Sequence, residues 1–258
     1  MPSAFTSNGE RMIVIPMAEM SRRFFDAGYS RPKYELPLDG QTLFASCLRS
    51  FEHYFGSERF VFVHRHAFGA DDFIARECDR LGLDNYLAAG LGESTRGQAE
   101  TVLRGLDAAS AGANEALLIF NIDTIRPHYR FPEAMGASDG YLEVFAGEGA
   151  HWSFVRPATS LCPLVAEATE KRRVSPLCST GLYYFARAAD FGASCEHALG
   201  DGGRYLRQWG ELYVAPLYNH LIAAGKRIMY HQISAHEVHF AGTPQEYSAL
   251  HDGARSLF

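Results

Sequence analysis

Residues 12–18 (MIVIPMA) form an uninterrupted apolar run, and the polar sequence EMSRR at residues 19–23 follows it directly. A short run without polar positions is typical of a strand whose two faces are both covered, as in parallel sheets. The polar turn then stands at the carboxyl end of the strand, where ligands bind in parallel α/β sheets. This stretch therefore predicts an α/β fold and the sheet edge at which a site is expected.

Similar apolar runs alternate with helical patterns through the first half of the chain. Residues 60–63 and 116–120 are wholly apolar and are predicted strands. Apolar residues recur at helical spacing over 43–54, 71–81 and 97–109. Strands that alternate with helices indicate a parallel sheet joined by right-handed crossovers. The first half is therefore predicted to be a parallel sheet flanked by helices.

The pattern changes after Pro127, where short predicted strands follow one another closely and few helices intervene. This pattern of closely spaced short strands favours antiparallel strands added to the first sheet. We predict strands at 141–145, 152–156, 180–185, 227–233 and 237–240, and a helix over 207–224. Residues 1–10 are small and polar and are predicted to be a flexible tail. Residues 11–258 show no repeat or linker, so we predict a single domain with two halves, 11–126 and 127–258.

Composition narrows the classes of function. The 258 residues carry 24 basic and 30 acidic side chains, a formal net charge of −6, which argues against a nucleic-acid or anionic-membrane partner. The five cysteines are scattered without a CxxC pair, so a zinc knuckle or a dithiol redox centre has no support. No apolar run is long enough to span a bilayer, and residues 1–11 lack the apolar segment of a signal peptide. We expect a cytoplasmic protein.

Two segments at the predicted carboxyl edge carry residues suited to phosphate chemistry. The first contains Arg22, Arg23 and Lys33, cations that a polyphosphate needs, and Pro32 restricts the backbone next to Lys33. The alternative is that these are solvated surface charges. The second contains Asp123, which follows a predicted strand and is placed to hold Mg²⁺ between phosphate oxygens. The alternative there is an aspartate that only caps a helix or turn.

Together with other short segments, these residues resemble the sugar-phosphate nucleotidyltransferases, and more closely the branch found in bacterial capsule and surface-polysaccharide clusters. The likeness covers nearly the whole chain in the right order. It rests on IPMAxxxxRF (15–24), GYxxPK (28–33), GQAE (97–100), NID (121–123), WSFV (152–155), EK (170–171), STGLYYF (179–185) and GTP (242–244).

The resemblance implies a Rossmann-like nucleotide-diphospho-sugar transferase fold with a mixed, mostly parallel central sheet flanked by helices. In that family a phosphate oxygen of the acceptor attacks the α-phosphate of a nucleoside triphosphate and pyrophosphate leaves. Residues 11–126 would be the nucleotide-binding half and residues 127–258 the acceptor-binding half. The product would serve surface-polysaccharide precursor synthesis.

The implied site residues follow from the matching positions. Catalysis would depend on Arg23 at the triphosphate, Lys33 at the α-phosphate and Asp123 as the ligand of Mg²⁺. We expect the Lys33 and Asp123 side chains to be exposed in a cleft. The nucleotide would also be bound by Ala18, Glu19, Ser21, Arg22, Gly97 and Gln98, with Gly97 and Gln98 along the nucleobase. The acceptor would be bound by Trp152, Glu170, Lys171, Thr180 and Gly181.

Two positions depart from the family pattern. The family has glycines where this chain has Glu19 and Ser21, and a carboxylate beside a triphosphate costs energy unless it turns away or a cation lies between them. The family's second metal aspartate falls on Phe240. Glu237 and His239 are near, but in a regular strand they face away from the side of Phe240. Metal binding would then depend on Asp123 alone.

These departures keep two other functions open. A glycosyltransferase of the related fold would use the same aspartate, although NID at residues 121–123 holds one carboxylate where that class has two. A catalytically impaired nucleotide-binding protein would follow if Glu19 disables the phosphate loop. The sequence identifies neither the nucleobase nor the acceptor, and it leaves a homo-oligomer open.

Overall fold

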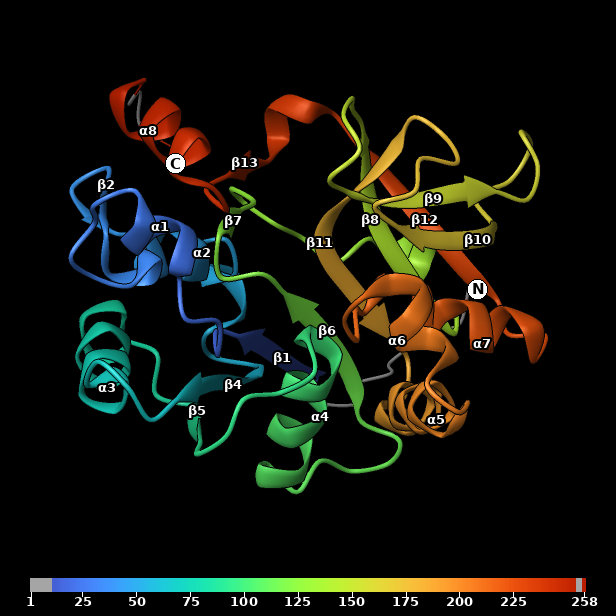
Figure 1. Ribbon diagram of the computed structural model, residues 1–258, viewed down its shortest axis with the longest axis horizontal. Coiled ribbons are helices and arrows are strands. Elements are labelled where there is room, and N and C mark those ends of the chain that lie inside the picture. The colour runs from blue at the N-terminus through green and yellow to red at the C-terminus, as the bar shows by residue number, and fades with distance from the viewer. Residues whose placement is uncertain (1–10, 254–256) are drawn as a thin grey trace, which may run out of the picture.

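The computed structural model describes residues 11–253, 257 and 258, so the predicted tail at residues 1–10 lies outside the described residues. Within the described part, nine strands form one sheet with the order β10-β9-β11-β6-β1-β4-β5, while β8 pairs with β11 and β12 pairs with β8 (Figure 1). The strands of this sheet are β1 (Arg11–Pro16), β4 (Arg59–Arg65), β5 (Tyr86–Leu91), β6 (Ala116–Phe120), β8 (Gly140–Ala146), β9 (Ser153–Pro157), β10 (Val165–Glu170), β11 (Leu177–Phe185) and β12 (Ile228–Ile233).

Shorter strands and the helices complete the fold. Two small ladders pair β2 (Pro37–Leu38) with β3 (Gln41–Thr42), and β7 (Thr124–Ile125) with β13 (His239–Phe240). The helices are α1 (Arg22–Asp26), α2 (Leu43–Arg49), α3 (Ala70–Leu81), α4 (Gln98–Ala108), α5 (Ala188–Gly200), α6 (Arg204–Trp209), α7 (Tyr218–Ala223) and α8 (Pro244–Asp252). None of the helices in the described residues is long and apolar enough to cross a membrane.

The two halves of the sheet differ in direction. β1 pairs in parallel with β4 and β6, and β4 pairs in parallel with β5. β11 runs antiparallel to β6, β8 and β9, and β12 then runs parallel to β8. The predicted mixed α/β sheet with a parallel first half is thereby confirmed. The carboxyl ends of β1, β4 and β6 lie at one edge, as the sequence predicted.

Helices cover both faces of the sheet, which explains the wholly apolar strands. Ile13 and Ile15 of β1 pack in one cluster with residues of α2 and α3. Met12 and Val14 face the other way and pack with residues of α4 and α5. Burying both faces requires apolar residues at consecutive strand positions, so the run at residues 12–18 follows from this layering.

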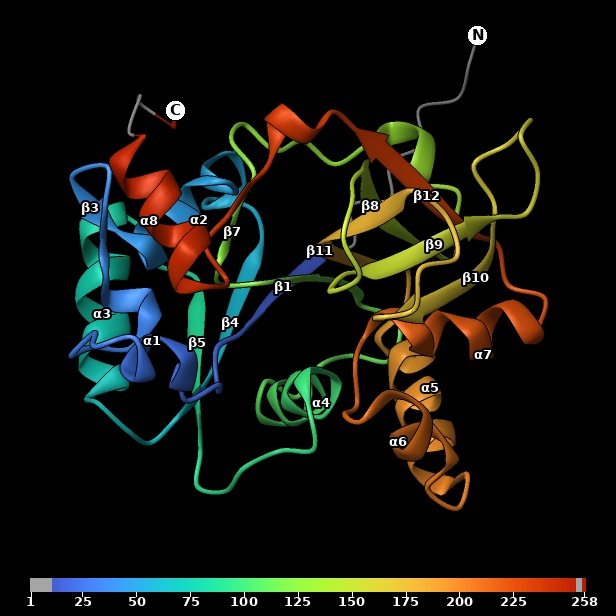
Figure 2. The ribbon, with the colours of Figure 1, turned by 45° about the horizontal axis from the view of Figure 1, so that its top comes forward.

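The C-terminal segment crosses back to the first half of the chain. Figure 2 shows α8, in red, beside α1 and α2 at the opposite end of the molecule from α5 and α6. Tyr247 of α8 is buried with Phe24 of α1, and its hydroxyl donates to the carbonyl of Pro37 at 2.6 Å. The chain that follows β12 therefore closes over the edge where β1 and β6 end.

Two predicted elements differ from the structure. The helix predicted over 207–224 is broken into α6 and α7, because Gly210 adopts φ +84° and ends α6, while Pro216 lies in a separate 3₁₀ turn. The strand predicted over 237–240 contains only His239 and Phe240. Glu237 instead ends a 3₁₀ turn, where its carboxylate accepts a hydrogen bond from the backbone N–H of Ser234.

Candidate functional site

The loop after β1 folds over the carboxyl edge of the sheet and reaches Lys33. The backbone N–H of Met17 donates to the carbonyl of Val63 at 2.8 Å, which ties the start of the loop to β4. Ser21 has φ +51°, a left-handed conformation unusual for a residue with a side chain. Its hydroxyl accepts the backbone N–H of Lys33 at 3.1 Å. The turn at Ser21 thereby fixes where Lys33 enters the site.

Lys33 joins the loop to the end of β6. Its ammonium nitrogen lies 2.6 Å from Oδ2 of Asp123 and 3.2 Å from Oε2 of Glu19. Burial lowers the pKa of Lys33, but the carboxylates of Asp123 and Glu19 outweigh it and leave that pKa raised. The expectation of an exposed Lys33 is wrong, since the residue is only 6% exposed. The ammonium is a fixed positive charge between two segments that are distant in sequence.

The Asp123 backbone is held by the segment that leads into α8. The N–H of Ala241 donates to the carbonyl of Asp123 at 2.8 Å. Gly242 passes so near that an added Cβ would lie 3.1 Å from Oδ2 of Asp123. The Asp123 side chain is 18% exposed, and its one hydrogen bond within the described chain comes from Lys33. Within the described residues its side chain therefore pairs with a lysine and caps no helix or turn.

Asn121 lies next to this pair and contacts two residues predicted for the site. The Gln98 amide donates to the side-chain oxygen of Asn121. Gly181 has φ +88°, and a Cβ there would clash with the Asn121 amide. The sequence motif contained Asn121 without assigning it a role, and the structure places it between Gln98 and Gly181.

The N-terminus of α4 packs directly on another backbone segment. Gly97 has φ +146°, and an added Cβ would lie 2.6 Å from the backbone nitrogen of Leu212. The N–H of Leu212 donates to the carbonyl of Arg96 at 2.8 Å, and the N–H of Ala99 donates to the carbonyl of Leu212 at 2.8 Å. Only glycine fits at position 97, because the two backbones touch there.

A second cluster is formed by residues predicted to meet the acceptor. The buried carboxylate of Glu170 accepts the hydroxyl of Ser153, and burial raises the pKa of Glu170. Lys171 has φ +52°, its N–H donates to the carbonyl of Trp152 at 2.9 Å, and its ammonium lies 2.5 Å from the hydroxyl of Tyr213. The strained backbone of Lys171 turns its side chain from the strand toward Tyr213.

Consecutive residues connect the two clusters. Leu212 packs against Gly97, and Tyr213, the next residue, contacts Lys171. The sequence did not predict this link, because residues 212 and 213 fall within the helix predicted over 207–224 but lie in an irregular segment between α6 and α7. The Gly97 cluster and the Lys171 cluster are therefore joined through two neighbouring residues of the chain.

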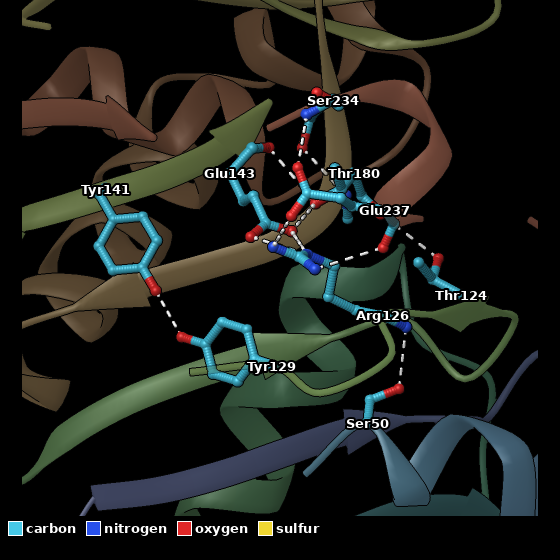
Figure 3. Close-up of polar contacts among 11 residues, drawn as sticks. Ser50, Thr124, Arg126, Tyr129, Tyr141, Glu143, Thr180, Ser234 and Glu237 are labelled. Atoms are coloured by element: carbon cyan, nitrogen blue, oxygen red, sulfur yellow. Dashed lines mark hydrogen bonds and ion pairs between the residues drawn. The ribbon is translucent and has the colours of Figure 1, made fainter. Parts of the chain in front are cut away.

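The Thr180 side chain is buried in the protein interior. Its hydroxyl donates to Oε1 of Glu143 at 3.2 Å, and Glu143 pairs with Arg126 at 3.2 Å (Figure 3). Arg126 also pairs with Glu237 at 3.3 Å. The Glu143 side chain is 1% exposed, so this is a buried ionic network beneath the site. The Thr180 side chain belongs to that network, and only its neighbour Gly181 faces Asn121.

Position 240 holds an aromatic ring where the resemblance implies a second carboxylate. Phe240 packs against Trp152 and Phe145, with ring centroids 4.7 and 5.3 Å away. The neighbouring Glu237 does not replace it, since its carboxylate is bound to Arg126 and to the Ser234 backbone. Within the described residues, no group of three or more His, Cys, Asp or Glu side chains could hold a metal ion.

The remaining predicted residues follow β1, and within the described chain they make no hydrogen bond or ion pair with Lys33 or Asp123. Ala18 is half-buried, while Arg22 and Arg23 are exposed on the first turn of α1. Lys33 and Asp123 therefore meet, whereas no hydrogen bond or ion pair joins Arg23 to either of them in the described chain.

A solved structure is similar to this chain in both sequence and fold. It is described as the nucleoside-diphosphate-sugar pyrophosphorylase from Vibrio cholerae RC9, with 45% identity over 93% of this chain and 100% of that chain, at a TM-score of 0.88. No protein-family model matches the sequence, and no curated protein matches it either.

More distant structures share the fold alone. A putative glucose-1-phosphate thymidylyltransferase from Bacillus anthracis has 13% identity over 96% of each chain, at a TM-score of 0.72. The inositol-1-phosphate CTP transferase from T. maritima has 14% identity over 92% of this chain and 91% of that chain, at 0.68. Identity of 45% over nearly the whole length, together with the same fold, shows that the chain belongs to the nucleoside-diphosphate-sugar pyrophosphorylases, a family of nucleotidyltransferases.

Proposed function

We propose that the protein transfers a nucleoside monophosphate from a nucleoside triphosphate to a sugar phosphate, or to another small phosphorylated alcohol, for the synthesis of surface-polysaccharide precursors. A phosphate oxygen of the acceptor attacks the α-phosphorus, a new P–O bond forms, and the bond to the β-phosphate breaks to release pyrophosphate. The observation that carries the proposal is the contact of Lys33 with Asp123 at the carboxyl edge of the parallel strands.

The nucleotide is assigned to the region of Lys33 and Asp123. Lys33 meets the α-phosphate as a permanent cation, because its raised pKa keeps it protonated at neutral pH. A fixed charge of this kind stabilises the negative charge that builds up during phosphoryl transfer. Gly97 and Gln98 lie along the nucleobase. The triphosphate lies against the loop of Ala18, Glu19, Ser21, Arg22 and Arg23.

The acceptor is assigned to the Lys171 side. Lys171 and Glu170 bind its phosphate and hydroxyl groups, with Trp152 as an apolar wall and Gly181 leaving room beside Asn121. Thr180 acts as a positioning residue, since its hydroxyl is bound to Glu143. In this arrangement the chain aligns two substrates, and no side chain has to act as a nucleophile.

The residues present fit a magnesium ion at Asp123. Its carboxylate already contacts a cation, the Lys33 ammonium, and offers the hard oxygen ligands that Mg²⁺ prefers. Magnesium is usually held by one or two carboxylates together with substrate phosphates, so a protein site with few ligands is expected. When bound, the ion neutralises charge on the phosphate oxygens.

Thermal unfolding in the presence of nucleotides tests this proposal. The panel contains CTP, UTP, GTP, ATP and dTTP with Mg²⁺, and a set of nucleotide sugars. Stabilisation by one triphosphate, followed by pyrophosphate release when sugar phosphates and phosphorylated alcohols are added, supports the proposal. Stabilisation by nucleotide sugars alone favours a glycosyltransferase. Triphosphate binding without pyrophosphate release in the presence of any acceptor favours an impaired nucleotide-binding protein.

A further inference from the structure

Glu19 replaces a loop glycine in the family pattern, yet its side chain makes a specific contact. Its Oε2 accepts the Lys33 ammonium at 3.2 Å, and the same ammonium contacts Oδ2 of Asp123. The carboxylates of Glu19 and Asp123, more than a hundred residues apart in sequence, therefore contact the same ammonium group. Glu19 therefore adds a second negative charge to the place that Asp123 occupies.

Each carboxylate keeps an oxygen available for a ligand. In the described part of the chain, Oε1 of Glu19 and Oδ1 of Asp123 have no hydrogen-bond or ion-pair partner. The Glu19 side chain is 79% exposed, whereas Lys33 is buried beneath it. A cation that approaches from solvent therefore meets Glu19 and Asp123 before it meets Lys33.

The charges at this point favour a divalent cation. Two carboxylates and one ammonium leave a net charge of −1, which would repel a polyphosphate. Binding of a divalent ion changes that sum to +1 and makes the place attractive to phosphate oxygens. With a neutral glycine at position 19, the charges of Asp123 and Lys33 would cancel. The net charge would then not change sign when a divalent ion binds.

We propose that Glu19 and Asp123 together bind the divalent cation of the nucleotide site, with Glu19 serving as the second carboxylate ligand. The two departures from the family pattern then compensate each other, because the carboxylate missing at Phe240 is supplied from the loop after β1. The role of the cation in this inference rests on the proposed function, but binding of the cation is measured without turnover.

Binding of Mn²⁺ to the protein tests the proposal. The bound fraction is measured from the electron paramagnetic resonance signal of the free ion. Three variants are compared with the unchanged protein: Glu19→Gln, Asp123→Asn and Asp26→Asn. The last removes an exposed carboxylate from α1 in the same part of the chain and serves as the matched control. Glu19→Gln keeps the size of an exposed side chain, so the fold should be retained.

Glu19→Gln and Asp123→Asn are each expected to weaken Mn²⁺ binding about tenfold or more, the effect of losing one charged ligand, while Asp26→Asn leaves it within about twofold. The proposal is overturned if Glu19→Gln binds Mn²⁺ as tightly as the unchanged protein, or if the unchanged protein binds none. Either result leaves the nucleotide and pyrophosphate assays to decide the proposed function independently. Tighter triphosphate binding by Glu19→Gly with unchanged Mn²⁺ affinity would instead show that Glu19 only obstructs the loop.

Discussion

The ammonium of Lys33 and the carboxylate of Asp123 meet at 2.6 Å across 90 residues of sequence. The contact joins the 3₁₀ turn that begins at Lys33 to the turn that follows β6. The backbones of both residues are also held, because the N–H of Lys33 donates to Ser21 and the carbonyl of Asp123 accepts from Ala241. A substrate bound at the proposed site would meet an ammonium and a carboxylate that are already paired, and charges placed before reaction are the condition for electrostatic catalysis.

Asp123→Asn should therefore abolish most of the turnover and leave the protein folded. The amide keeps the shape of the side chain but removes the charge that pairs with Lys33 and that we propose to bind the cation. We expect pyrophosphate release to fall by about a hundredfold or more, with a cooperative unfolding transition retained. Asp26→Asn is the control for loss of one carboxylate nearby. Turnover of Asp123→Asn at the unchanged rate would contradict the assigned role.

Gly181→Ala should weaken substrate binding without touching a charged group. A Cβ at position 181 clashes with the Asn121 amide, and φ +88° is unfavourable for alanine. Asn121 must then shift and release Gln98. We expect a loss of stability of about 1–3 kcal/mol and a rise in KM for the triphosphate or the acceptor. Gly192→Ala in α5, where an added Cβ meets nothing within 4 Å, is the comparison.

Elements that local patterns determine were predicted well from the sequence. The strand at residues 116–120 matches β6, and the helix predicted at 71–81 matches α3 to within one residue and ends at Gly82. Both patterns are decided within one element, by apolar runs, helical spacing and a left-handed glycine. In contrast, β5 and α8 were not predicted, because their burial depends on distant partners such as β4 and α1.

The same division applies to the site. Lys33 and Asp123 were recognised as a pair through ordered motifs, and the structure confirms that they meet. The burial of Lys33 was not predicted, because it depends on tertiary contacts such as those with Glu19 and Asp123. Tyr213 was not recognised, since its role follows only from the tertiary contact with Lys171. A motif can identify residue types, but it does not show which backbone covers them.

Glu100→Gln should destabilise the start of α4 in a pH-dependent way. Hydrogen bonds from the Arg96 side chain, at 2.9 and 3.1 Å, lower the pKa of Glu100 to about 2. A lowered folded-state pKa stabilises the fold above the ordinary value of 4.5, and this stability is lost as the pH falls from there toward about 2. We expect a cost of about 1 kcal/mol at pH 7, since Arg96 is half exposed.

Urea unfolding of Glu100→Gln at pH 7 and at intervals down to pH 3.5 checks this. The difference from the unchanged protein should shrink steadily below pH 4.5. Glu93→Gln, an exposed glutamate in the loop before α4, should show no such trend. A difference that stays constant over this range would mean that the ion pair with Arg96 does not stabilise the folded state.

Removal of Arg126 should cost more stability than removal of the Glu143 charge, although the two form one ion pair (Figure 3). Arg126→Met leaves two carboxylates, Glu143 and Glu237, without their cation, and one of them is almost fully buried. Breaking a buried pair in this way costs about 3–5 kcal/mol. Glu143→Gln leaves Arg126 paired with Glu237 and keeps an oxygen for the Thr180 hydroxyl, so we expect about 1–2 kcal/mol.

Urea unfolding at pH 7 compares the two variants, with the m-value checked for each to ensure the same transition. The network holds Thr180, and Gly181 follows it, so Arg126→Met should also raise KM for the acceptor while Glu143→Gln raises it less. An equal cost for both variants would show that Glu237 is not a true partner of Arg126. A larger cost for Glu143→Gln would mean that the carboxylate of Glu143, and not the guanidinium, organises the strands beneath the site.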